Sequence, residues 1–283
     1  MLSYLNRKNI SFMDWFIERH DGTGFMIRAD KKLYEGETFQ KIEIYSTSLG
    51  KMLVLDGKIQ FTERDEMMYH EMLVHVPMMM HLSPRKVLII GGGDGGAARE
   101  ALKHEPSSIT VVEIDANVVE KCREYVGIDN GALNDERVSI VYEDGIEFVK
   151  NCEEHFDVVI VDGTEPNIFS SHIASRQFYE AAMGIADIMV TQSQSPFFQQ
   201  DYFKAIAKNS AFLKNRRFYI SYMPSYPSGL WSFMIAGDYE LNEDEIRKRY
   251  EERKIKTRHY NVEMHMAAFA LPNWMKEMLH DYR

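Results

Sequence analysis

The first 65 residues alternate between short apolar and polar runs, which is the pattern of half-buried β-strands. The stretches FMIRAD and LYEGETFQKIEIYSTSLGKMLVLDGKIQFT are broken at Gly36, Gly50 and Gly57. The pair Asp56-Gly57, between MLVL and KIQF, is a strong signal for a hairpin turn. We therefore predict a small antiparallel β domain over residues 1–65.

The pattern changes at residue 66, where we place the start of a second domain over 66–283. In DEMMYHEMLVHVPMMMHL the apolar positions recur every three to four residues, which predicts a helix, and we expect Pro84 to end it. Its methionines are expected to be adaptable core residues at positions 67, 68, 72, 78, 79 and 80.

Strand-like and helix-like runs alternate beyond Pro84. Five apolar runs are predicted strands, at 86–90, 109–113, 138–142, 157–161 and 188–191. Their near-continuous apolar character is typical of parallel strands buried on both faces, and the alternation with helices is typical of a doubly wound sheet. The later stretch RFYISYMPSYPSGLWSFMIAGD predicts two more strands around a Pro/Gly connection. The predicted fold class is α/β, with a mostly parallel sheet after the small β domain.

Carboxylates stand at the carboxyl ends of four successive predicted strands, where open α/β sheets bind their ligands. These strand ends carry Asp94, Glu113, Asp144 and Asp162, with Glu165 close behind and Gln192 after the fifth strand. A single acid at such a place is ordinarily a helix cap. Four acids in one crevice repel one another unless a cationic or hydroxyl-rich ligand lies among them.

The turn GGGDGG after the first parallel strand matches the spacing of a dinucleotide-binding loop, and Glu113 falls where the ribose-binding acid belongs. Asp94 argues against a dinucleotide, because two charges about 4 Å apart interact by roughly 4 kcal/mol at an effective dielectric near 20. A nucleoside that carries a sulfonium and an amine fits better. Glu113 would then accept the ribose hydroxyls, Asp144 the adenine amino group, and Asp94 the ammonium.

Composition excludes several classes of protein. The 283 residues include 33 Lys and Arg against 43 Asp and Glu, and this net charge of −10 argues against a nucleic-acid partner and suits a cationic ligand. No apolar run approaches the roughly 20 residues of a membrane span, and no signal peptide is recognised, so we expect a cytoplasmic protein without a membrane partner. Cys122 and Cys152 lack metal-ligand spacing and are expected to be reduced thiols. We predict no metal site and no prosthetic group.

Several motifs together resemble the polyamine aminopropyltransferases, the spermidine synthase family: LDGKIQFTERDEMMYHEMLVHVP, KVLIIGGGDGGAAREALKH, VEID, EDG, PSYPSG and HMAAFALP. The resemblance extends from about Trp15 to the C-terminus. It implies a Rossmann-like methyltransferase fold after an N-terminal β domain, and a homodimer or homotetramer. It also implies transfer of the aminopropyl group of decarboxylated S-adenosylmethionine, a co-substrate, to a small-molecule diamine. Putrescine is the simplest acceptor, giving spermidine and 5′-methylthioadenosine.

The resemblance also implies roles for matching positions. Asp162 would be the base near the attacking amine, and Tyr69 would orient that amine. The residues implied to hold the nucleoside donor are Gln40, His70, Gly91, Gly93, Asp94, Glu113, Asp144 and Gly145. The residues implied to line the acceptor channel are Trp15, Gln60, Tyr69, Asp162, Glu165, Gln192 and Tyr226.

The segment after Asp162 departs from the family pattern D-S-[ST]-D-P. Gly163 replaces a small hydroxyl residue, Glu165 replaces an aspartate, and Gln194 stands where many relatives have glutamate. These changes concern the acceptor, so cadaverine, agmatine and spermidine stay open beside putrescine. Two other hypotheses also stay open: an amine N-methyltransferase, against which Asp94 argues, and a non-catalytic polyamine-binding homologue.

Overall fold

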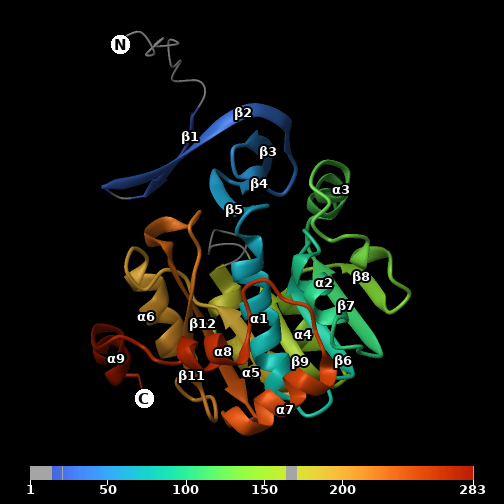
Figure 1. Cartoon of the computed structure of the whole chain (residues 1–283), viewed down its shortest axis with the longest axis vertical. Helices are drawn as coiled ribbons and strands as arrows, with labels where there is room; N and C mark the ends of the chain where they lie inside the picture. The colour runs from blue at the N-terminus through green and yellow to red at the C-terminus, as the bar shows by residue number, and fades with distance from the viewer. Residues whose placement is uncertain (1–14, 21, 164–170, 283) are drawn as a thin grey trace, which may run out of the picture.

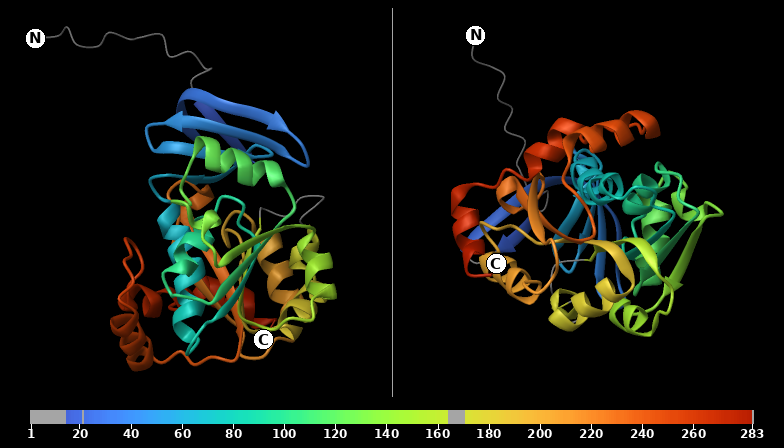
Figure 2. Two further views of the ribbon diagram at one scale, coloured as in Figure 1. Left: turned by 90° about the vertical axis from the view of Figure 1, so that its right-hand side faces the viewer. Right: turned by 90° about the horizontal axis from the view of Figure 1, so that it is seen from below.

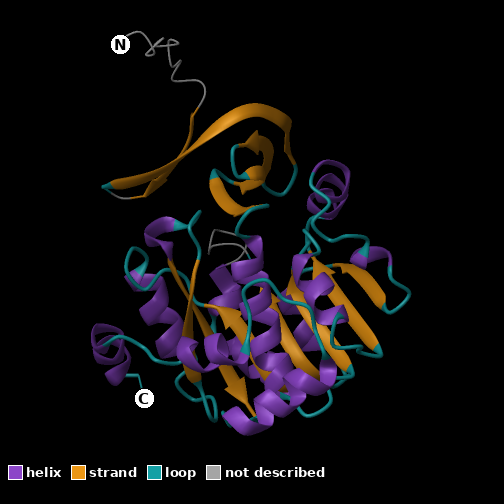
Figure 3. Ribbon diagram, in the orientation of Figure 1, coloured by secondary structure: helices purple, strands orange, loops and turns teal. Residues whose placement is uncertain are grey.

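The computed structural model describes residues 15–20, 22–163 and 171–282, and two sheets organise this part of the chain (Figure 1). A small sheet lies at one end of the molecule, beyond a larger sheet that carries helices on both faces (Figure 3). Helix α3 (Ala116–Tyr125) lies directly below the small sheet in the turned view (Figure 2). Its Val118 and Cys122 share one apolar cluster with the lower face of the small sheet.

The small sheet is antiparallel in the order β1-β2-β3-β4-β5. Its strands are β1 (Trp15–His20), β2 (Thr23–Glu37), β3 (Lys41–Thr47), β4 (Gly50–Leu55) and β5 (Lys58–Thr62). The predicted hairpin joins β4 to β5, and Asp56 and Gly57 both have positive φ, as a type I′ turn requires. The stretches FMIRAD and LYEGE, predicted as separate runs, form the single strand β2. The pairing of β2 with β3 shifts its register at two places, and the strand continues past both irregularities.

The larger sheet has the order β11-β12-β10-β9-β6-β7-β8. Its strands are β6 (Lys86–Gly91), β7 (Ser108–Glu113), β8 (Val138–Tyr142), β9 (Phe156–Asp162), β10 (Ala186–Gln192), β11 (Arg217–Tyr222) and β12 (Leu230–Gly237). The five strands predicted to be parallel are parallel, and β11 and β12 add an antiparallel edge. The prediction that the parallel strands are buried on both faces is wrong for β8. Its side chains are half-exposed or exposed, because β8 is the other edge strand of the sheet.

Two apolar cores cover the two faces of the larger sheet. Along β6, Val87 and Ile89 join one core while Leu88 and Ile90 join the other, because successive side chains point to opposite faces. The first core contains residues of α1 (Glu66–Met80), α2 (Gly96–Leu102), α7 (Glu243–Arg253) and α8 (Val262–Ala268). The second contains residues of α4 (Gly145–Asn151), α5 (Arg176–Gly184), α6 (Gln200–Asn209) and α9 (Asn273–His280).

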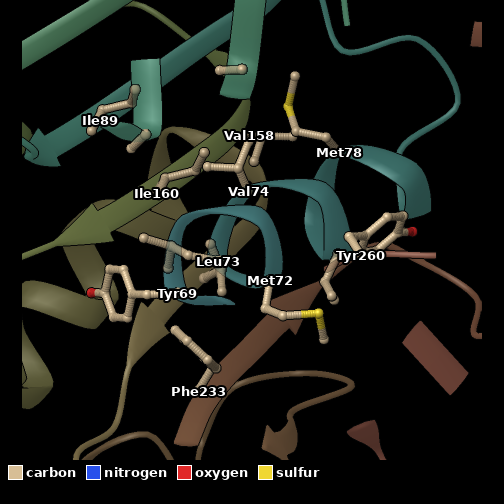
Figure 4. Packing of buried hydrophobic residues seen from close by; sticks show 14 of the residues in the cluster. Tyr69, Met72, Leu73, Val74, Met78, Ile89, Val158, Ile160, Phe233 and Tyr260 are labelled. Atoms are coloured by element: carbon tan, nitrogen blue, oxygen red, sulfur yellow. The ribbon is translucent and has the colours of Figure 1, made fainter. Parts of the chain in front are cut away.

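Helix α1 is buried on every side. Met72 and Val74 lie in the same core as Val158 of β9 and Phe233 of β12 (Figure 4). The helix ends at Met80, four residues before Pro84, the predicted stop. The guanidinium groups of α7 explain this early end, since Arg249 and Arg253 donate hydrogen bonds to the carbonyls of Met78, Met79, His81 and Leu82.

The order of the strands reverses between β6 and β9. The next α-helices along the chain after these strands, α2 and α5, cover opposite faces of the sheet, which places a crevice at the carboxyl ends of β6 and β9. Gly91 of β6 faces Asp162 of β9 in the register. Gly91 has a φ of +82°, and a Cβ there would lie 2.2 Å from the carbonyl oxygen of Asp162, so this close approach requires glycine. The small sheet is tied to the rim of the crevice by the Tyr226 hydroxyl, which donates to the carbonyl of Gln60 in β5.

Two expectations about the whole chain can be compared with the structure. Within the three described ranges, no helix is both long and apolar enough to cross a bilayer. Cys122 is buried, Cys152 is half-buried, and both are free thiols.

Candidate active site

A cavity lies at the crevice between β6 and β9, with the small sheet above it. Thirteen of the predicted site residues line it: Gln40, Gln60, Tyr69, His70, Gly91, Gly93, Asp94, Glu113, Asp144, Gly145, Asp162, Gln192 and Tyr226. Trp15, at the start of β1, is not among the lining residues. Glu165 lies outside the described residues.

Glu113 ends β7 and is fixed by backbone groups. One carboxylate oxygen accepts the N–H of Gly93 at 3.1 Å and the other accepts the N–H of Asp115 at 3.0 Å. Burial raises the pKa of Glu113 to about 7, although these two N–H groups favour its charged form. A carboxylate held in this way presents its remaining lone pairs to hydroxyl groups in the cavity.

Asp94 and Asp144 are also held by local hydrogen bonds. Asp94 Oδ1 accepts the N–H of Gly96 at 2.7 Å, and Asp144 Oδ1 caps α4 by accepting the N–H of Ile146 at 2.7 Å. The ordinary capping role of a strand-end acid is therefore present at Asp144, and the same side chain lines the cavity. Burial disfavours the charge on Asp94, but His70 and the Gly96 N–H outweigh it and lower the pKa of Asp94.

Asp162 ends β9 and uses only one of its carboxylate oxygens. The Tyr69 hydroxyl donates to Oδ1 at 2.9 Å, while Oδ2 is buried and has no hydrogen-bond partner among the described residues. Burial and the charge of Asp94 raise the pKa of Asp162 to about 6, although His70 and Tyr69 act in the opposite direction. Burial and the Asp162 charge raise the pKa of Tyr69 well above its usual value, so Tyr69 stays a hydrogen-bond donor.

These groups lie close together. One nitrogen of His70 and one carboxylate oxygen each of Asp94 and Asp162 lie within 4.8 Å of one another. Two buried acids at this distance disfavour each other's charge, and a cationic ligand between them relieves the repulsion. The arrangement can therefore hold an ammonium or sulfonium and accept a proton at Asp162 Oδ2.

Gln192 ends β10, which pairs with β9, and its side chain also lines the cavity. Gln192 Nε2 donates to the Gly163 carbonyl at 3.2 Å, and Gln192 Oε1 accepts the N–H of Gln194 at 3.2 Å. Both ends of the Gln192 amide thus bind backbone groups, and this fixes the side chain in place. Gln194 has a φ of +68° and a buried Oε1 without a partner in the described ranges, and it is not a lining residue.

Sequence reasoning missed several lining residues. Trp231 of β12 lines the cavity, its ring packs edge-on against that of Tyr226 at 4.6 Å between centroids, and its buried indole N–H has no partner in the described part of the chain. Phe39 and Ile173 line the cavity as well. Trp231 comes two residues after the PSYPSG motif, and this position was the signal that could have found it.

Two family models match this chain. Residues 66–245 match the spermine/spermidine synthase domain, and residues 14–63 match the spermidine synthase tetramerisation domain. The second match supports the expected homo-oligomer. Together the two matches cover both sheets of the structure.

Curated relatives agree with these models. The chain is 52% identical to a polyamine aminopropyltransferase of Archaeoglobus fulgidus over 266 residues, which cover 94% of this chain and 98% of the relative. It is 39% identical to a polyamine aminopropyltransferase of Clostridium perfringens over 277 residues, covering 94% and 97% of the two chains.

Solved structures agree as well. A spermidine synthase in complex with the transition state analogue AdoDATO matches with a TM-score of 0.90 and 35% identity, over 94% of each chain. The spermidine synthase of Thermotoga maritima matches with a TM-score of 0.89 and 36% identity, also over 94% of each chain. The predicted fold class and the predicted transferase activity are thereby confirmed. The chain belongs to the spermidine synthase family of polyamine aminopropyltransferases.

Proposed function

We propose that this chain transfers the aminopropyl group of decarboxylated S-adenosylmethionine to putrescine and releases spermidine and 5′-methylthioadenosine. The observation that carries the proposal is Asp162 Oδ2, a buried carboxylate oxygen without a partner among the described residues, in the wall of a cavity that also holds Asp94. An uncompensated buried acceptor costs about 1–3 kcal/mol, and an amine N–H would compensate it.

The nucleoside donor is proposed to bind along the ends of β6, β7 and β8. Glu113 would accept the ribose hydroxyls, Asp144 and Gly145 would contact the adenine, and Asp94 would pair with the aminopropyl ammonium. Ordinary S-adenosylmethionine carries an additional carboxylate that this pose brings close to Asp94. Their repulsion should cost a few kcal/mol, or roughly 10²–10³ in affinity, so Asp94 would select the decarboxylated donor.

In the proposed reaction the acceptor nitrogen attacks the carbon next to the sulfonium. The new N–C bond forms as the C–S bond breaks, the electron pair of that bond stays on sulfur, and the amine proton goes to Asp162 Oδ2. An alkylamine has a pKa near that of lysine, so freeing its lone pair at pH 7 costs about 4.6 kcal/mol. A carboxylate with a pKa of about 6 is mostly ionised at neutral pH and accepts this proton.

The acceptor is proposed to lie along Gln60, Gln192 and Tyr226, with the indole of Trp231 against its methylene chain. Glu165 is proposed to meet the far ammonium. Trp15 was expected in this channel and does not reach the cavity within one chain, so it has no part in this pose.

The test is incubation of the protein with decarboxylated S-adenosylmethionine and, separately, putrescine, cadaverine, agmatine and spermidine, with products identified by mass. Parallel reactions contain S-adenosylmethionine instead. Spermidine from putrescine supports the proposal, and preference for another amine would correct the acceptor alone. Methylated amine from S-adenosylmethionine would favour an N-methyltransferase. No product with any amine would favour a non-catalytic binding protein.

The expectations for domain boundary, oligomeric state, location and cofactors are proposed together with this activity. We propose a domain boundary between residues 65 and 66, a homodimer or homotetramer, a cytoplasmic location, and catalysis without a prosthetic group or metal. Light scattering of the purified protein distinguishes dimer from tetramer. Activity that survives extensive treatment with a chelator would support catalysis without a metal.

A further inference from the structure

His70 is buried between two acids. Its Nδ1 lies 2.7 Å from Glu66 Oε2, and its Nε2 lies 3.5 Å from Asp94 Oδ1. The ring sits against Gly96 at the start of α2, where a Cβ would come within 2.4 Å of it. Because each ring nitrogen faces a carboxylate, the form that can donate to both is the imidazolium.

Glu66 is itself fixed from behind. Arg99 Nη2 donates to the same Glu66 Oε2 at 2.8 Å. Arg99 also donates to the Ile128 carbonyl at 2.6 Å and to Glu100 at 2.8 Å, so its guanidinium has little freedom. Neither Glu66 nor Arg99 lines the cavity, and Glu66 is only 6% exposed. They can therefore affect a ligand through His70 and Asp94 without touching it.

We propose that Glu66, fixed by Arg99, is a positioning residue that holds a His70 imidazolium against Asp94, and that the ammonium of the nucleoside donor displaces this ion pair. The Nε2–H bond of His70 then breaks, its electron pair stays on the nitrogen, and the proton leaves to the solvent. The inference rests on the proposed function, because the ammonium belongs to the proposed donor.

The charges around His70 support this exchange. Burial disfavours the imidazolium, but the carboxylates of Asp94 and Glu66 outweigh it and hold the pKa of His70 well above its usual range. Among the described residues, the other titratable or charged neighbours are Tyr69 on the same helix, whose ring lies edge-on to the imidazole, Asp162 of β9 and Arg99 of α2. The donor adds a sulfonium and an ammonium to this buried group, so loss of one proton restores most of the charge balance.

The exchange makes donor affinity depend on pH in a known direction. Binding releases a proton wherever free His70 is protonated, so the dissociation constant should fall about tenfold for each unit of rising pH until the pKa of His70 is reached. Glu66→Gln keeps the shape of the side chain and removes its charge, so His70 loses its proton at lower pH. In Glu66→Gln, the pH above which the dissociation constant of the donor stops changing should be lower than in wild type by at least about one unit.

The experiment is isothermal titration of wild type and variants with decarboxylated S-adenosylmethionine between pH 6.5 and 9, in two buffers of different ionisation enthalpy. The control ligand is 5′-methylthioadenosine, which lacks the aminopropyl group and therefore carries neither the ammonium nor the sulfonium charge. The control variant is Glu71→Gln, because Glu71 is buried on the same helix but accepts the N–H groups of Arg258, His259 and Tyr260. Loss of that carboxylate should lower stability and leave proton release unchanged.

Both ligands place ribose hydroxyls on Glu113, whose pKa is about 7, so the difference between the two ligands reports on His70. The expected result is that the decarboxylated donor releases close to one proton more than methylthioadenosine, and that this difference is smaller in Glu66→Gln at pH 7.5. Equal proton release by the two ligands, or identical pH profiles in wild type and Glu66→Gln, would overturn the inference and leave the proposed function standing. Failure of wild type to bind the decarboxylated donor would overturn both. If Glu66→Gln does not fold, His70→Gln replaces it, and its binding of the donor should release no more protons than its binding of methylthioadenosine.

Discussion

The half of the cavity proposed for the nucleoside donor, called the donor half below, and the half proposed for the amine differ in their hydrogen bonding. In the donor half, Asp94, Glu113 and Asp144 each accept backbone N–H groups. In the other half, Asp162 Oδ2 and Trp231 Nε1 are buried and have no partner within the described ranges. Buried polar groups are normally satisfied, so Asp162 Oδ2 is the atom of the second half that an amine N–H would complete.

This difference has a physical consequence for mutations. A carboxylate held by backbone N–H groups keeps its position without a ligand, so its removal should affect recognition of the nucleoside. An oxygen that has no partner gains a hydrogen bond only when a substrate donates to it. Its removal should therefore affect the rate of the chemical step. The two halves should therefore be separable by measuring binding and turnover independently.

The largest effect expected on donor recognition comes from Asp94→Asn. The preference for decarboxylated S-adenosylmethionine over S-adenosylmethionine should fall by roughly 10²–10³, because the amide neither attracts the ammonium nor repels the extra carboxylate. Dissociation constants of both ligands measure this preference. Asp144→Asn is the control, since both ligands contain the same adenine and should weaken together. An unchanged preference in Asp94→Asn would remove Asp94 from donor selection.

A smaller effect is expected from Tyr69→Phe, which removes the hydrogen bond to Asp162 Oδ1. Turnover should fall about tenfold, the scale of one hydrogen bond to a charged group. That hydrogen bond lowers the pKa of Asp162, so its loss raises this pKa. Activity needs the carboxylate, and its loss at acid pH should therefore begin at higher pH in the variant. Tyr219→Phe is the control, because Tyr219 donates to the Met72 carbonyl in the core; matching pH profiles in both variants would contradict the assignment.

The smallest effect is expected from Trp231→Phe. The acceptor KM should rise less than about threefold, because an ammonium has no lone pair for the indole N–H and only packing against the methylene chain is lost. The dissociation constant of the nucleoside donor should not change. Steady-state kinetics and titration measure the two quantities. A tenfold rise in acceptor KM with unchanged thermal stability would mean that the indole N–H contacts the bound acceptor through a water or a neutral amine.

All eight residues predicted for the donor half line the cavity, whereas Trp15, predicted for the other half, does not, and the reason is local. Asp94, Glu113 and Asp144 follow strands whose apolar runs are easily recognised, and a parallel sheet brings such ends together. The positions of the five parallel strands along the chain and the hairpin at Asp56-Gly57 follow from equally local signals.

The other half depends on contacts between distant segments. Trp231 reaches the cavity from β12, and Tyr226 binds the Gln60 carbonyl across 166 residues of sequence. Arg99 and Glu66 lie on different helices, so their pairing was not visible as a motif. Propensity and periodicity carry no information on such long-range pairs, which tertiary packing decides.

The most direct test of the account is the single-turnover rate of Asp162→Asn with decarboxylated S-adenosylmethionine and putrescine both bound. Asp157→Asn is the control, because Asp157 stands at the other end of β9 and accepts the N–H groups of Arg85 and Lys86. The account predicts a rate at least about 10² below wild type in Asp162→Asn, the scale of a lost general base, and a near wild-type rate in the control. A rate in Asp162→Asn within about threefold of wild type would contradict proton transfer to Asp162 Oδ2.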